Sequence, residues 1–229
     1  MSPSNRKQFH LIVLWLCSSM FIYAQDDFPD WGSRASFKQD LKRSSLLVNL
    51  PNLTDSDHFL GVQMSGGVIS TSSGGLQLLP AARLSLFPNP DYNLWVQFGS
   101  WSGNETNFSV GTGIQIEFNG ENARRRQAIG LSWNSAYAED YSQRDIAVHG
   151  LLGYHWNGFN LGLIALYDFH HLIVTDGLGI PDYDESIWMG VPYITWMLNE
   201  SFKTFVNIPI NSTGPGIAVG CELLIRKRH

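Results

Sequence analysis

The sequence has little charge, little cysteine and no apolar run long enough for a membrane-spanning helix. Only 15% of its 229 residues are charged, whereas ordinary soluble domains have about 25%. The longest apolar stretch, 10–24, is shorter than the roughly 20 residues that a helix needs to cross a bilayer. The net charge of −5 gives no reason to expect nucleic acid as a partner. These absences argue against a cytosolic enzyme, a nucleic-acid-binding protein and a helical membrane anchor.

The first residues have the parts of an export signal. Basic Arg6 and Lys7 precede an apolar stretch at 11–23, and Ala24 is followed by a polar run. Such signals direct export and are removed afterwards. We therefore expect residues 1–24 to be a signal peptide.

The two cysteines are Cys17 and Cys221, and the first lies inside the predicted signal. Removing the signal leaves Cys221 alone, so we expect no internal disulfide and no cysteine-based metal cluster. The acidic segment 182–185 could bind Ca²⁺ through its carboxylate oxygens, but acids spread over a loop more often form a solvated surface. We therefore predict no metal and no cofactor.

The segment 25–57 differs in pattern from the rest of the chain and allows three interpretations. Ser33 could cap a short amphipathic helix in which Phe37 and Leu41 share one face. Such a helix could lie on the membrane surface or close one end of a barrel. The segment could equally be a loose periplasmic lead-in, or 45–53 could pair as an additional strand.

The stretch 107–118 alternates strictly between two kinds of residue. A period of two places alternate residues on opposite faces of a strand. One face is small or polar, and the other is apolar with an aromatic residue at each end: Phe108, Val110, Thr112, Ile114, Ile116 and Phe118. This pattern is typical of a strand with lipid on one side and a crowded polar lumen on the other.

The same alternation recurs in ten stretches of a length that spans a bilayer as tilted strands. They lie at 60–68, 76–86, 92–99, 107–118, 128–137, 145–156, 159–169, 187–198, 202–208 and 217–226. Short turns are expected at 88–91, 119–122, 157–158 and 199–200, and they alternate with longer loops. The sequence predicts an all-β fold: a closed antiparallel up-and-down transmembrane β-barrel of about ten strands at 58–229.

The seventh and eighth stretches are predicted to be joined by a long loop, and the eighth has two apolar faces. We expect the longest connection to run from 170 to 186. At 187–198 both faces are apolar, and we place Trp188, Pro192, Ile194 and Trp196 on the lumen face.

The competing interpretation is a soluble barrel of the lipocalin kind, whose apolar face points inward. A water-facing exterior should carry many interspersed charges, but neither face here is rich in charge, and aromatic residues gather at the strand ends as they do at lipid headgroups. The stretch from 59 to 226 therefore resembles the class of small bacterial outer-membrane β-barrel proteins. The resemblance implies a bacterial outer-membrane location, with membrane lipid and the outer-membrane assembly machinery as partners. The oligomeric state stays open.

Isolated ionisable residues fall on the predicted lumen face. We expect Arg83 to pair with Glu117 and Lys203 to pair with Glu222, because ion pairing is how buried charge is tolerated. Asp145, His149, His155 and Asp168 lie on adjacent stretches.

Two functions remain open at this point. In the first, the barrel is a structural or binding protein or a narrow channel for small solutes, since barrels of about eight strands are just filled by side chains. In the alternative, the protein is an outer-membrane enzyme that hydrolyses lipids or peptides. Its candidate catalytic residues are then His149, His155 and Asp168.

Overall fold

The computed structural model describes residues 58–70, 76–89, 91–101, 107–118, 124–137, 141–156, 158–174, 182–211 and 214–225. The predicted signal peptide at 1–24, the segment 25–57 and the last four residues lie outside these ranges. Across the part of the chain that is described, no helix has the length and apolar character needed to cross a membrane.

The described residues form one antiparallel sheet. Its strands are β1 (Leu60–Ser70), β2 (Leu76–Asn89), β3 (Tyr92–Trp101), β4 (Asn107–Glu117), β5 (Arg125–Tyr137), β6 (Tyr141–Trp156), β7 (Phe159–Val174), β8 (Tyr183–Asn199), β9 (Phe202–Asn207), β10 (Ile210–Asn211) and β11 (Gly214–Ile225). Each strand pairs with the next along the chain, apart from the junction at β9 and β10.

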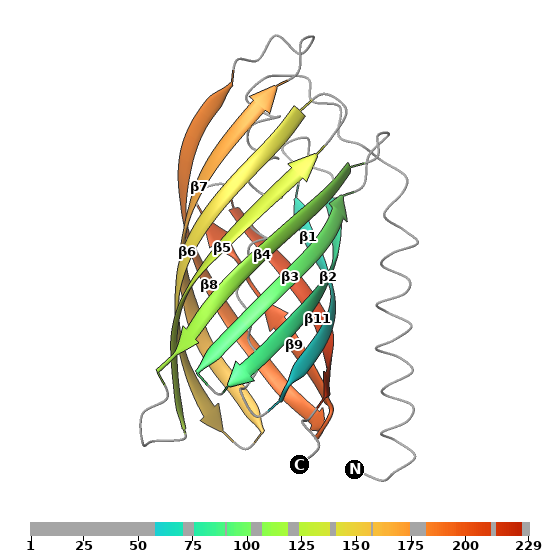
Figure 1. Ribbon diagram of the computed structural model, residues 1–229, viewed down its shortest axis with the longest axis vertical. Coiled ribbons are helices and arrows are strands. Elements are labelled where there is room, and N and C mark those ends of the chain that lie inside the picture. Colours follow the sequence, from blue (N-terminus) through green and yellow to red (C-terminus); the bar gives the residue numbers. More distant parts are fainter. Residues whose placement is uncertain are drawn as a thin grey trace.

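The sheet closes on itself, because β1 pairs with β11 as well as with β2. In that seam Gln63 lies opposite Glu222 on one side and opposite Arg83 on the other. Strands β9 and β10 are two parts of one pass, separated by Ile208 and Pro209. The described chain therefore makes ten passes around a closed barrel of tilted strands (Figure 1), which confirms the predicted fold class.

The two ends of the barrel differ in their connections. At the turn end, β6 and β7 are joined tightly through Gly158, whose φ of +84° favours glycine. The β8–β9 connection at the same end is also tight, as predicted for 199–200. At the opposite end, which we call the loop end, lie the connections from β1 to β2, β3 to β4, β5 to β6 and β7 to β8 (Figure 1).

Burial alternates along the strands as the sequence pattern predicts. Large apolar residues are exposed along the outer surface, for example Leu84, Leu86, Leu94, Val96, Ile129, Leu131, Leu161 and Leu163. Their neighbours on the inner face are buried, and many are polar, including Arg83, Gln97, Gln115 and Ser132. A soluble barrel would show the reverse arrangement, so the lipocalin interpretation is wrong.

Strand β8 is the exception to the predicted facing. Trp188 was expected inside, but its side chain is 71% exposed on the outer surface. The inner positions are Ile187, Met189, Val191 and Tyr193, all buried. Because both faces of this strand are apolar, alternation alone could not distinguish them. The pairing of Ile187 with Asp168 of β7 fixes which face is inside.

The predicted connection at 170–186 is also wrong in its bounds. β7 continues to Val174 and β8 begins at Tyr183, so most of that stretch is strand. The three neighbouring strands β6, β7 and β8 have 16, 16 and 17 residues and rise highest at the loop end (Figure 1). The sequence pattern indicates a loop here because outer residues of the stretch, such as His171 and Asp184, are polar. They pair across the strands in the continuing register.

Candidate functional site in the barrel lumen

The inner wall formed by β6, β7 and β8 has three zones along the barrel. Nearest the loop end is a polar group of ionisable side chains, Asp145, Asp168 and His170. The middle zone is buried and mostly apolar, with His149 of β6 next to Leu151, Ile164, Leu166, Met189 and Val191. Nearest the turn end are His155, Asn160 and Thr195. The polar group is the strongest candidate for a site, because all its members have zero exposure.

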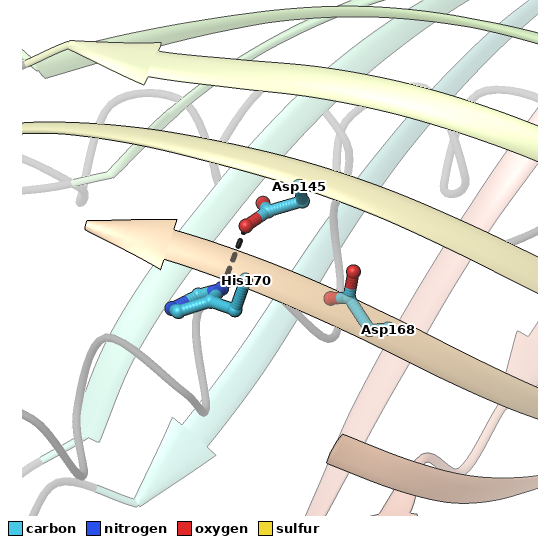
Figure 2. Close-up of side chains that lie close together, drawn as sticks. All are labelled: Asp145, Asp168 and His170. Atoms are coloured by element: carbon cyan, nitrogen blue, oxygen red, sulfur yellow. Dashed lines mark hydrogen bonds and ion pairs between the residues drawn. The ribbon is translucent and has the colours of Figure 1, made fainter. Parts of the chain in front are cut away.

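Asp145 of β6 and Asp168 and His170 of β7 face one another across the inner wall (Figure 2). The backbone register explains this, because His170 lies directly opposite Asp145 and Asp168 lies two residues along the same face of β7. The Nδ1 atom of His170 is 2.6 Å from Oδ1 of Asp145. One potential ligand atom from each of the three residues lies within 4.8 Å of the other two. We call these three residues the Asp–Asp–His group.

Amide side chains hold the Asp145 carboxylate in place. Nε2 of Gln143 donates to both carboxylate oxygens, at 3.0 and 2.8 Å. Nδ2 of Asn134, on β5, lies 3.4 Å from Oδ2 of Asp145. A carboxylate that accepts several hydrogen bonds can remain charged inside a protein. The group is therefore built into a polar network across β5, β6 and β7.

Two ion pairs occupy other parts of the lumen. Nζ of Lys203 lies 2.9 Å from Oε2 of Glu222, which confirms the predicted pair. Glu117 was expected to pair with Arg83, but the structure shows a bidentate ion pair between Glu117 and Arg126 of β5. Nε of Arg126 donates to Oε2 of Glu117 at 2.9 Å. Arg83 donates from Nη2 to Oε1 of Gln97 at 2.6 Å.

The structure does not gather the three predicted catalytic residues at one place. Nε2 of His149 is 3.1 Å from Oε1 of Gln115, in the buried middle of the barrel. His155 lies six residues further along β6, about 20 Å away, where it is exposed and hydrogen-bonded to Asn160 at 2.8 Å. Asp168 belongs to the Asp–Asp–His group. The hydrolase constellation proposed from the sequence is therefore not assembled.

Sequence reasoning missed His170, Gln143 and Arg126. The predicted seventh stretch ends at Phe169 and so excludes His170. The predicted fifth stretch begins at Ala128 and so excludes Arg126, whereas β5 begins at Arg125. A signal for His170 was present, since it follows Asp168 at i+2 and so shares its face in any continuing strand.

No family model and no curated protein matches the sequence. Solved structures with similar folds include the translocator domain of the autotransporter NalP from Neisseria meningitidis, with 12% identity, coverage of 82% of this chain and 94% of that one, and a TM-score of 0.41. Omp33 from Acinetobacter baumannii is 10% identical, with coverage of 75% of this chain and 100% of that one and a TM-score of 0.39. Outer membrane phospholipase A from Escherichia coli is 9% identical, with coverage of 80% of this chain and 98% of that one and a TM-score of 0.34. At these scores the likenesses carry no information about activity.

The closed sheet and the chemistry of its two faces indicate a membrane environment. In a bilayer every backbone polar group must be satisfied internally, and a closed barrel achieves this with strands. The exterior is apolar and the lumen polar, as in barrels of outer membranes. The chain thus has the architecture of a small outer-membrane β-barrel protein.

Proposed function

We propose that the protein is a sealed outer-membrane barrel with a structural or binding role, and that it is not an open channel. The observation that supports this proposal is the burial of the lumen. Many inner side chains from around the barrel have at most 1% exposure, among them Ser85, Gln115, His149, Leu166, Thr195, Lys203 and Glu222. A passage wide enough for water would leave accessible surface on the side chains that line it.

Three aromatic side chains contribute to the seal by fitting over glycines of neighbouring strands. A methyl group at Gly113 would overlap the ring of Trp95, one at Gly162 would overlap Tyr193, and one at Gly220 would overlap Phe205. The three rings are only 2–4% exposed, so other atoms cover them on the lumen side as well. The glycines therefore provide the room for large rings inside a narrow barrel.

Barrel width agrees with this proposal. About eight strands enclose a space that side chains just fill, and wide aqueous channels need about sixteen. Ten passes add little room, and the rings of Trp95, Tyr193 and Phe205 occupy part of it.

Conductance in planar lipid bilayers tests the proposal. We expect the refolded wild-type protein to give no steady single-channel current, because its lumen is filled. Removing two lumen rings in Trp95→Ala/Phe205→Ala should produce measurable current. The matched control is Trp133→Ala, which removes a ring of the same kind from the outer surface and should leave the bilayer silent. Steady channels in the wild type would overturn the proposal.

A further inference from the structure

We propose that the Asp–Asp–His group is a binding site for a divalent transition-metal ion, with Zn²⁺ as the best-suited probe. This inference concerns the loop end of the lumen and is independent of whether the barrel is sealed.

The donor set points to this class of ion. Carboxylate oxygen and imidazole nitrogen are the ligands that Zn²⁺ takes in addition to thiolate. Imidazole suits Zn²⁺ and its first-row neighbours, whereas Mg²⁺ and Ca²⁺ prefer oxygen alone. Asp145, Asp168 and His170 supply two oxygens and one nitrogen. Three protein ligands leave a fourth position for water or a bound molecule.

The spacing suits a metal after a small adjustment. Donors around a tetrahedral Zn²⁺ lie about 3.4 Å apart, given metal–ligand distances near 2.1 Å. In the structure the three donor atoms already lie within 4.8 Å of one another. The closest two, Nδ1 of His170 and Oδ1 of Asp145, are 2.6 Å apart and share a proton. A metal would replace that proton and separate these two atoms slightly.

Asn134 offers an additional oxygen next to the group. Its side chain is 1% exposed, and its Oδ1 has no hydrogen-bond partner in the described part of the chain. Its Nδ2 faces Asp145 at 3.4 Å, a long contact for a hydrogen bond. Rotating the amide by half a turn would place Oδ1 beside the carboxylate, which is favourable only when a cation lies between them.

The acids of this part of the wall also suit a cation. Asp145 and Asp168 both have zero exposure, and Glu185 of β8 lies opposite His170 in the register and adds a further acid. A divalent ion is attracted to several carboxylates that lie close together.

Metal binding to the full-length mature protein, refolded without an affinity tag and stripped with a chelator, tests the site. We expect equilibrium dialysis against Zn²⁺ to load one ion per chain. Asp168→Asn and His170→Gln each remove a ligand and should each weaken Zn²⁺ binding by at least about 100-fold, since loss of a partner outside the ligand shell already costs about 10- to 100-fold. Heat-modifiable gel migration verifies that each variant is folded.

Matched controls lie close by in the chain. His171 and Asp184 form a second pair whose Nδ1–Oδ1 distance is also 2.6 Å, but on the outer surface, and His149 is another buried histidine of the lumen. His171→Gln and His149→Gln should bind Zn²⁺ as the wild type does. Equal loss in His171→Gln and His170→Gln, or an unloaded wild type, would overturn the proposal.

A measurement on the wild type alone covers the case in which the variants fail to fold. Co²⁺ in place of Zn²⁺ should give the visible absorption of a four-coordinate ion with nitrogen and oxygen ligands, and Zn²⁺ should abolish it by competition. A spectrum identical to that of Co²⁺ in buffer would contradict the site.

Discussion

His170 and His171 are consecutive residues that form the same kind of pair in opposite surroundings. Each presents Nδ1 to an aspartate oxygen at 2.6 Å, His170 to Asp145 and His171 to Asp184. The first pair is inside the barrel with zero exposure of both side chains. The second is outside, with 38% and 63% of the two side chains exposed. One step along a strand therefore changes the environment completely.

The contribution of an aspartate–histidine pair to stability therefore depends on which side of the barrel wall the pair occupies. Water screens and competes with the outer pair, so it should add little to stability. Breaking the inner pair leaves a buried polar group without its partner, which strongly destabilises the fold. Changes to the inner pair should therefore cost more than the same changes to the outer pair.

The largest effect is expected from Asp145→Ala. It removes the partner of His170 and the acceptor of Gln143, and we expect the free energy of unfolding to fall by about 3–5 kcal/mol. Urea titration of the protein in lipid vesicles, followed by tryptophan fluorescence, measures the change. A loss below 1 kcal/mol would mean that the inner wall is solvated, contrary to its burial.

A charge on the outer face should cost somewhat less. Ile114 is exposed on the surface that we assign to lipid, and Ile114→Arg should destabilise the barrel by about 2–4 kcal/mol if it lies near the bilayer midplane. Ile114→Leu serves as the control, with little change expected. Unaltered stability of the arginine variant in vesicles would show that this face does not meet lipid.

Adding a methyl group tests the packing of the two faces without changing charge. Gly113→Ala places a methyl group against the inner Trp95 ring and should cost about 1–3 kcal/mol through overpacking. Gly150→Ala is the matched substitution on β6, where nothing lies within 4 Å of the added carbon, and it should be neutral or slightly stabilising. Equal effects of the two in the same urea titration would rule out the packing of Trp95 against β4.

The smallest effect is expected from the exposed pair. Asp184→Asn removes its charge and should change the free energy of unfolding by less than about 1 kcal/mol. The same substitution at the inner pair, Asp145→Asn, provides the direct contrast and should cost more. A double-mutant cycle on His171 and Asp184 measures the coupling, and a value as large as that of the inner pair would contradict the comparison.

Much of the fold could be predicted from the sequence because the outer and inner faces differ in chemistry. Alternation placed Ile114 outside and Gln115 inside, and the structure confirms both. Alternation does not distinguish the faces of β8, because inner Met189 and outer Trp188 are both apolar. Only the register with β7 resolves such a strand.

The candidate site was less predictable, since it depends on strand ends and on partners distant in sequence. Asp145 and Asp168 were placed in the lumen correctly, but His170 was assigned to a loop because the strand extends beyond its lipid-facing part. The partner of Glu117 depended on how far β5 extends toward its start, where Arg126 lies. Lys203 and Glu222 were found because they occupy clear inner positions of adjacent strands, directly opposite each other.

Quenching of tryptophan fluorescence by lipids brominated along their acyl chains tests the assignment of the two faces most directly. Two single-tryptophan variants are compared, one keeping Trp133, which is 41% exposed on the outer surface, and one keeping Trp95, which is 2% exposed inside. We predict strong quenching of Trp133 and weak quenching of Trp95. Strong quenching of Trp95 with little effect on Trp133 would contradict the account.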